Sequence, residues 1–257
     1  MESASFYVTL PSNASMDIYP NNTKSNFQVR LPRTLYLNSR YEVALSEIQY
    51  PVSWHTFAHA DSYQFLISMM ADKEDPHIQA MFFPKAYYKT MHELVQKIND
   101  NLFAHFLLNN REGNEAILYV HEVEEKIEII TKRGAAVKFP NEVADVLGLD
   151  HNTYYRGKHW APHRYDITRG FNAMYVNCNV CSPQIVGDVY APLLRCVPVQ
   201  GERGEHVMKT YSDPHYIPVA DRQVDVIEIN IRDDTGALVP FTSGKVVCKL
   251  HFRQRTL

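Results

Sequence analysis

The sequence predicts a mainly β protein, a sandwich of two sheets with one inserted lobe that contains helices. Three observations support this prediction. Apolar and polar residues alternate along several short segments, which is the pattern of a half-buried strand. The twelve Phe, sixteen Tyr and fourteen Pro residues favour strands that are joined by extended loops. Residues 90–106, in the middle of the sequence, change instead to a helical period.

The clearest alternation lies in residues 224–232 and 245–253. Isoleucine takes alternate positions in the first segment, and Val, Cys, Leu and Phe do so in the second. Asp233 and Gly236 between them favour a turn, because Asp bonds to nearby backbone and Gly accepts positive φ. We therefore expect two strands that are joined by one turn. The best partner for the second strand is residues 27–31, and this pairing would bring the two ends of the chain together.

Three more strands are expected at residues 5–10, 41–50 and 63–70. In the middle one of these, the odd-numbered positions are large and apolar up to Leu45, and Glu47 then breaks the alternation. A β-bulge near Ser46 would return the apolar residues that follow to the buried side.

An insertion with helices is predicted at about residues 85–150. Thr90 can cap a helix, and Glu93 supplies the second half of a capping box. Apolar residues then recur at helical spacing up to Phe106, which predicts an amphipathic helix. The patterns that follow indicate a hairpin at 117–129, a strand at 137–139 and a short helix at 141–147 that Gly148 ends.

The sequence after the insertion returns to strands. Residues 151–164 are aromatic and basic without any periodicity, which predicts a long loop. Further strands are expected around 173–175, within 185–199 and at 216–219. At least eight strands then lie outside the insertion, the number that a jelly roll needs. We expect one domain, residues 1–257, that is a single jelly-roll β-sandwich with an inserted helix-hairpin-helix lobe.

Composition and charge exclude several classes of function. The net charge of −3 gives no general basic field for nucleic acid. No stretch approaches the roughly 20 apolar residues of a membrane span, and residues 1–10 lack the pattern of a signal peptide. We therefore expect cytosolic synthesis, no membrane partner and no specific nucleic acid. Four cysteines are too few for a disulfide scaffold.

Three short motifs contain residue types that bind metals: His55 with His59, His159 with His163, and Cys178 with Cys181. Histidines four residues apart share a face only in a helix, and neither histidine pair lies in a helical pattern. His92 and Glu93 begin like a metalloprotease helix, but Gln96 stands where the second histidine must be. We therefore expect no catalytic residues, no metal and no cofactor.

Four segments resemble the minor capsid protein of Polinton (Maverick) elements, which are virus-like DNA transposons related to adintoviruses and virophages. These segments are residues 6–13 (FYVTLPSN), 41–51 (YEVALSEIQYP), 185–189 (IVGDV) and 231–236 (IRDDTG). The resemblance implies a single jelly-roll penton protein, five copies of which fill each capsid vertex beside a double jelly-roll major capsid protein. It implies a place in the virion after synthesis in the host cytoplasm, and it brings no catalytic residues.

A closed ring of subunits joins two different surfaces of each copy, and the centres of such contacts favour aromatic residues and arginine. The candidate interface residues are of these types and lie in segments without a strand pattern: Tyr50, Trp54, Tyr154, Tyr155, Arg156 and Trp160. Two alternative functions stay open. One is a jelly-roll module for carbohydrate or protein, with Tyr154, Tyr155 and Trp160 as an aromatic platform. The other is a cupin-like metalloenzyme that uses the histidines, which is less favoured because no His-x-His pair lies on a strand.

Overall fold

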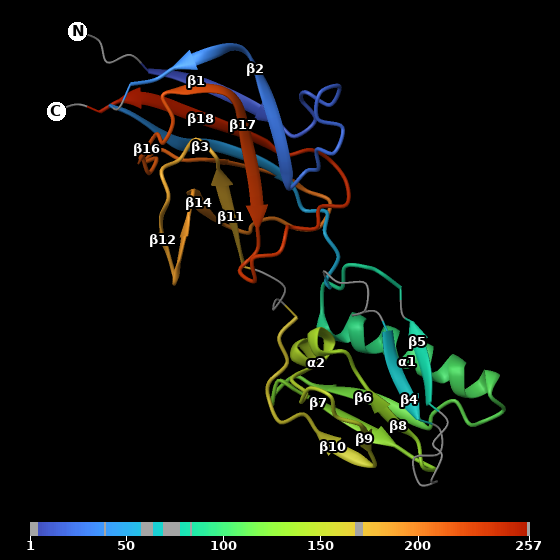
Figure 1. Ribbon diagram of the computed structural model, residues 1–257. Helices are drawn as coiled ribbons and strands as arrows, with labels where there is room; N and C mark the ends of the chain where they lie inside the picture. The colour runs from blue at the N-terminus through green and yellow to red at the C-terminus, as the bar shows by residue number, and fades with distance from the viewer. Residues whose placement is uncertain are drawn as a thin grey trace. The chain divides into compact units, whose positions relative to one another are not determined.

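The computed structural model describes residues 5–38, 40–57, 64–68, 78–82, 84–167 and 172–255. The chain divides into two compact units, each with its own hydrophobic core (Figure 1). The sandwich unit comprises Met1–Trp54 and Phe171–Leu257, and the inserted unit comprises His55–Gly170. In the part of the chain that is described, no helix is long and apolar enough to span a membrane.

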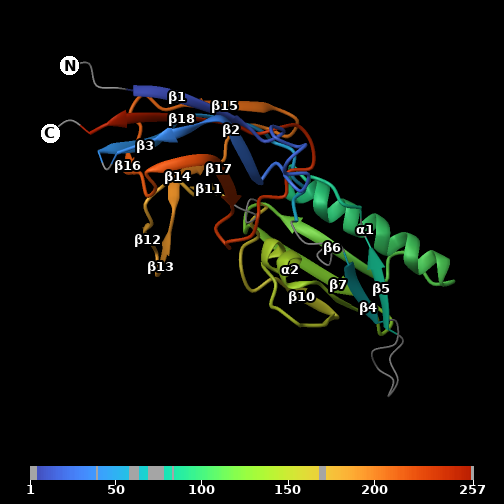
Figure 2. The same ribbon diagram turned by 45° about the horizontal axis from the view of Figure 1, so that its top comes forward.

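Eight main strands form the two sheets of the sandwich unit (Figures 1 and 2). They are β1 (Ser5–Pro11), β2 (Asn26–Tyr36), β3 (Tyr41–Pro51), β11 (Ala173–Cys178), β14 (Leu193–Pro198), β15 (His206–Thr210), β17 (Gln223–Arg232) and β18 (Val247–Gln254). The first sheet has the order β1-β18-β3-β15, and the short β16 (Ile217–Pro218) also pairs with β3. The second sheet has the order β14-β11-β17-β2.

The strand pairing is nested and antiparallel throughout. The first main strand pairs with the last (β1 with β18), the second with the seventh (β2 with β17), the third with the sixth (β3 with β15) and the fourth with the fifth (β11 with β14). Such a pattern arises when one long hairpin rolls up into two facing sheets, which is the jelly roll. The predicted fold class is therefore confirmed.

The pairing predicted for residues 27–31 is wrong. These residues belong to β2 and pair with β17, with Phe27 opposite Ile229. The two C-terminal strands exist as expected, but β17 and β18 lie in different sheets and do not pair with each other. Residues near the two ends do pair, through β1 and β18, with Ser5 opposite Arg253. Several strands present an apolar face to the same core, so alternation alone could not choose between them.

The β-bulge predicted near Ser46 is confirmed. Along β18, Lys249 lies opposite Glu47 and the next residue, Leu250, lies opposite Leu45, so Ser46 is the extra residue of β3. The Ser46 hydroxyl donates a hydrogen bond to the carbonyl oxygen of Lys249 at 2.8 Å. Because of the bulge, Leu45 before it and Ile48 and Tyr50 after it all pack into the core.

The core of the sandwich unit lies between the two sheets. The second sheet contributes the isoleucine face of β17, whose alternate isoleucines are fully buried as the sequence predicts. The first sheet contributes Leu250 and Phe252 of β18, which are also fully buried. The ring of Phe252 stacks on Phe6 of β1, with centroids 5.1 Å apart, so the outermost strand pair is joined by side chains as well as backbone.

The described residues of the inserted unit form two helices and two small sheets. The helices are α1 (Met91–Leu108) and α2 (Asn141–Leu147). The strands are β4 (Gln64–Ser68), β5 (Ile78–Phe82), β6 (Ala116–His121), β7 (Lys126–Thr131), β8 (Ala136–Lys138), β9 (Tyr155–Arg156) and β10 (Lys158–Trp160). One sheet has the order β10-β7-β6 and the other β5-β4-β8-β9.

The ends of both helices match the sequence-based prediction. The Thr90 hydroxyl accepts a hydrogen bond from the backbone N–H of Glu93 at 3.2 Å, which satisfies one free donor of the first turn of α1. The Glu93 carboxylate accepts from the N–H of Lys89 at 2.8 Å, one residue before the expected partner. Gly148 ends α2 in the left-handed region with φ of 74°, a conformation that favours glycine.

The inserted unit is larger than the predicted insertion at residues 85–150. On its N-terminal side, β4 pairs with β8, so the segment before residue 85 belongs to the same sheet. On its C-terminal side, residues 151–164 were predicted as a loop, yet they contain β9 and β10, which pair with β8 and β7. Strands of two and three residues are too short to show a period. Part of the strand predicted at 63–70 falls outside the described residues.

Candidate assembly surfaces

Three of the six candidate interface residues are buried in their own units: Tyr50, Trp54 and Tyr155. The Tyr50 hydroxyl accepts a hydrogen bond from the backbone N–H of Gln200 at 2.9 Å, and burial raises the pKa of Tyr50. Trp54 packs edge-on against Phe241, with ring centroids 5.8 Å apart. The two rings of the sandwich unit therefore stabilise its core, and their truncation acts first on folding.

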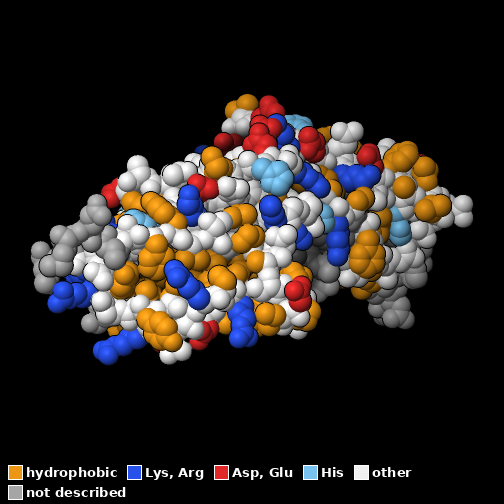
Figure 3. All heavy atoms as spheres, turned by 90° about the horizontal axis from the view of Figure 1, so that it is seen from above, with side chains coloured by type: hydrophobic (Ala, Val, Ile, Leu, Met, Phe, Trp, Pro, Cys, Tyr) orange, Lys and Arg blue, Asp and Glu red, His pale blue; other side chains and the backbone are white. Residues whose placement is uncertain are grey.

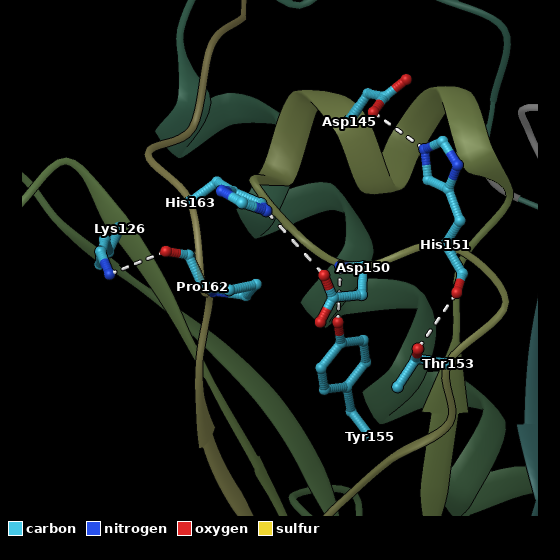
Figure 4. A network of polar contacts seen from close by, with 8 residues as sticks. All are labelled: Lys126, Asp145, Asp150, His151, Thr153, Tyr155, Pro162 and His163. Carbon is cyan, nitrogen blue, oxygen red and sulfur yellow. Dashed lines mark hydrogen bonds and ion pairs between the residues drawn. The ribbon is translucent and has the colours of Figure 1, made fainter.

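Tyr155 belongs to a polar network around the segment that follows α2 (Figure 4). Its hydroxyl accepts a hydrogen bond from the backbone N–H of Asp150 at 2.8 Å, and burial raises its pKa. Nε2 of His163 lies 3.9 Å from Oδ1 of Asp150, and Nε2 of His151 lies 2.9 Å from Oδ1 of Asp145. Each of these histidines therefore contacts a different carboxylate, and they do not share a site.

The other three candidates, Tyr154, Arg156 and Trp160, are exposed. Tyr154 precedes β9, and Nζ of Lys138 lies 5.5 Å from its ring centroid. Trp160 lies on β10, in the other sheet of the inserted unit. Because Tyr155 is buried between these positions in the sequence, Tyr154, Tyr155 and Trp160 do not form the aromatic platform that the carbohydrate alternative needs.

Trp160 instead forms a row with two other residues on neighbouring strands. It pairs with Glu128 of β7, which pairs in turn with Tyr119 of β6. The Glu128 carboxylate lies 2.8 Å from Nζ of Lys158 and 3.1 Å from Nε2 of His121. The hydrogen bond from Lys158, together with that from His121, lowers the pKa of Glu128. This face of the inserted unit thus presents the exposed rings of Tyr119 and Trp160 on either side of an ionised Glu128 that is already paired with Lys158.

The cysteine motif forms part of the sandwich core. Cys178 and Cys181 are both buried and free. A hydrogen bond with Cys178, with burial as a second cause, raises the pKa of the Cys181 thiol, and burial raises that of Cys248. Zinc binds the thiolate form, so these groups suit packing and not metal binding.

The histidine motifs give no shared site either. His159 bonds to the backbone carbonyl of Arg156, whereas its sequence partner His163 faces Asp150. His59, the partner of His55, lies outside the described residues. Within the described ranges, no group of three or more His, Cys, Asp and Glu side chains is placed to hold a metal ion.

A pocket on the outer face of the first sheet was not predicted from the sequence. In this sheet the edge next to β3 is interrupted, because β15 pairs with β3 only as far as Glu47 and β16 begins opposite Val43. The loop 211–216 between them covers a pocket of about 280 Å3 beside the Ser46 bulge. Residues that line it include Tyr7, Ser46, Thr210, Tyr216, Lys249 and His251.

Aromatic and basic side chains fix the wall of this pocket. The Tyr7 ring stacks on His251 with centroids 4.4 Å apart, and Nζ of Lys249 lies 5.1 Å from the Tyr7 centroid. The Tyr216 hydroxyl lies 2.6 Å from Nδ1 of His251. Burial, and then the charge of Arg253, lower the pKa of His251. The imidazole is therefore neutral at neutral pH, which allows Nδ1 to accept a hydrogen bond from the Tyr216 hydroxyl.

A small β-hairpin extends from the second sheet. It consists of β12 (Gln184–Val186) and β13 (Val189–Ala191), joined by Gly187 and Asp188, and Gly187 has φ of 62°. Ile185 lies opposite Tyr190, and these side chains are 71% and 76% exposed. Figure 2 shows the hairpin on the side of the second sheet that faces away from the first. These exposed apolar side chains make the hairpin a candidate interaction surface.

Comparisons with known proteins identify a similar fold. No family model matches the sequence, and no curated protein matches it. Among solved structures, the crystal structure of the selenomethionine-labelled mavirus penton protein is similar, with a TM-score of 0.52 and 12% sequence identity. The match covers 98% of this chain and 100% of that chain. The resemblance inferred from the sequence is therefore confirmed at the level of the fold.

Proposed function

We propose that this chain is the penton, or minor capsid, protein of a Polinton-like element, and that five copies form each vertex of an icosahedral capsid. The observation that carries this proposal is the nested jelly roll with a unit inserted between β3 and β11. The mavirus penton protein is similar to nearly the whole of this chain, which includes both units. The role is structural, and its site is the virion.

The two outer faces of the sandwich unit support an assembly role. Subunits in a closed ring make heterologous contacts, so each copy must offer two different complementary surfaces. One face carries the pocket beside Ser46 and the other carries the β12–β13 hairpin. The proposed partners are therefore other copies of this chain and, around the ring, a double jelly-roll major capsid protein.

Co-expression with the major capsid protein of the same element tests this function. We expect this chain to form rings of about five times the 29.7 kDa mass of one copy. In assembled capsids, electron micrographs should show fivefold symmetry at the vertex. Light scattering and mass photometry measure the mass, with the major capsid protein expressed alone as the control. Monomers or dimers only, with the major capsid protein present, would contradict the proposal.

A further inference from the structure

The β12–β13 hairpin is held at its base but lacks support from a third strand in the described chain. The Gln184 side-chain amide donates a hydrogen bond to the carbonyl oxygen of Leu193, which ties the base to β14. An isolated two-stranded hairpin is marginally stable in water. This one has three residues in each strand and exposes Ile185, Val189 and Tyr190. Such a hairpin gains stability when its apolar side chains are covered.

The pocket on the first sheet has the size and lining for such side chains. Ligand pockets for small molecules span roughly 300–1,000 Å3, and this pocket of about 280 Å3 lies just below that range. It suits one or two side chains better than a cofactor. Its lining includes Tyr7, Tyr216 and Ser46, and this mixture of aromatic rings and hydroxyl groups matches a tyrosine, which has an apolar ring and a polar end.

Charge also favours this match. Asp188 places a carboxylate at the tip of the hairpin, between β12 and β13. Lys249 places an ammonium group on the pocket wall, above the Tyr7 ring. Glu47 lines the pocket too, but one of its carboxylate oxygens already accepts a hydrogen bond from the Gln49 amide at 2.8 Å. An approaching acidic tip thus meets the Lys249 ammonium group, which contacts the Tyr7 ring, beside a carboxylate that is held by the Gln49 amide.

The hairpin and the pocket lie on opposite sides of one sandwich. The hairpin extends from the second sheet, on the side that faces away from the first (Figure 2). The pocket is lined by outward-facing residues of the first sheet, such as Lys249 and His251 of β18. Figure 3, which shows the molecule from above, has hydrophobic side chains mixed with Lys and Arg and with Asp and Glu on the visible face. A copy therefore cannot place its own hairpin in its own pocket, so a hairpin that fills this pocket must come from a neighbouring copy.

We propose that the β12–β13 hairpin of one copy docks in the pocket beside Ser46 of the next copy, with Tyr190 as the inserted side chain. The contact is head-to-tail, which is the type that closes into a ring when each copy is rotated by a fifth of a turn. The inference rests on the proposed function for this ring. It adds the surfaces through which neighbouring copies meet.

Two substitutions test the two sides of the contact. Tyr190→Ala removes the inserted ring, and Thr210→Trp fills the pocket from an exposed strand position. We expect each to weaken pentamer formation about tenfold or more, as the loss of a buried tyrosine anchor does. The matched control is Tyr36→Ala, because Tyr36 is 77% exposed on β2 and far along the chain from the hairpin. All three variants should keep the melting temperature of the parent protein.

A disulfide trap tests the same contact directly. Val189→Cys and Thr210→Cys are combined with Cys196→Ser, which removes the exposed native thiol. Oxidation should then link chains into a ladder of up to five on a non-reducing gel. The control replaces Val189→Cys by Tyr36→Cys, and this pair should give no ladder.

The outcomes separate this inference from the proposed function. If wild-type rings form and both substitutions leave them intact without a ladder, the hairpin contact is wrong and the penton role stands. If Tyr190→Ala leaves the ring intact but blocks its incorporation into capsids, the hairpin binds the major capsid protein, and docking between copies is overturned. If the wild-type protein forms no ring even with the major capsid protein, both proposals fall.

Discussion

The sandwich unit and the inserted unit differ in how far along the chain their strands find partners. In the sandwich unit, β1 and β18 pair Ser5 with Arg253, and β2 pairs with β17. In the inserted unit, β6 and β7 are neighbours in the chain, and α1 packs against β6. Local signals therefore specify much of the inserted unit. The fold of the sandwich unit depends on which distant strands pair, and this pairing is determined by how their apolar faces pack in one common core.

The largest test of this difference is deletion of residues 245–257. This change removes β18, which lies between β1 and β3 at the centre of the first sheet. We expect the sandwich unit to unfold completely, because β1 loses its strand partner, β3 loses the partner along one of its edges, and the core loses Leu250 and Phe252. The inserted unit should keep its fold. Amide hydrogen exchange measures the protection of each unit, and a sandwich unit that stays protected would contradict the nested pairing.

Two phenylalanines give a finer comparison of the units. Phe252 and Phe106 are both fully buried, one in each core. Replacement by Ala should lower the free energy of unfolding of the affected unit by about 3–5 kcal/mol. Denaturant titration followed by hydrogen exchange should show each loss in one unit only. A shared loss would mean that the two units unfold as one.

The two tryptophans separate core residues from surface residues. Trp54 is 8% exposed in the sandwich core, whereas Trp160 is 44% exposed on the inserted unit. Trp54→Ala should cost about 3 kcal/mol of the stability of the sandwich unit, and Trp160→Ala less than about 1 kcal/mol of that of the inserted unit. Thermal melts provide the measurement. An equal loss for both would show that the Trp160 ring is structural.

The smallest effect concerns pH and the inserted unit. The hydrogen bond from Lys158, with that from His121, lowers the pKa of Glu128 in the folded state. Its contribution to stability is therefore present above the unfolded pKa of about 4.3 and is lost as pH falls through the folded value. Melts of the parent between pH 7 and pH 2 should show this loss. Glu128→Gln should have a flatter profile, and an identical profile would remove Glu128 as the cause.

Local chemistry allowed several elements to be predicted from the sequence. Thr90 and Gly148 fixed the start of α1 and the end of α2, because caps depend only on neighbouring backbone. The bulge at Ser46 followed from a single break in the alternation. Strand partners could not be obtained in this way, since an apolar face shows that a strand is covered but not by which strand.

The candidate surfaces were harder to predict than the fold. Tyr155 was expected at an interface because its two-residue strand shows no period, yet it is buried. The hairpin had a signal, the Gly187 and Asp188 pair between apolar residues, but residues 185–199 look like one apolar segment broken only by prolines. The pocket had none. It forms where β15 stops and β16 begins, and in β15 the side chain that packs on the core is Val207, too little for an apolar alternation.

The nested pairing also sets the order in which the chain can fold while it is being made. The partners of β4 to β10 all lie between residues 64 and 160, so the inserted unit can complete its sheets early. The strands β1, β2 and β3 precede it, but their partners β15, β17 and β18 begin only at residues 206, 223 and 247, the last of them about 200 residues after β3. At about 5–20 residues per second this is a wait of roughly 10–40 s. During that time these strands have unpaired edges, which can join other chains. We therefore expect nascent chains at high concentration to associate through these strands before the sandwich closes.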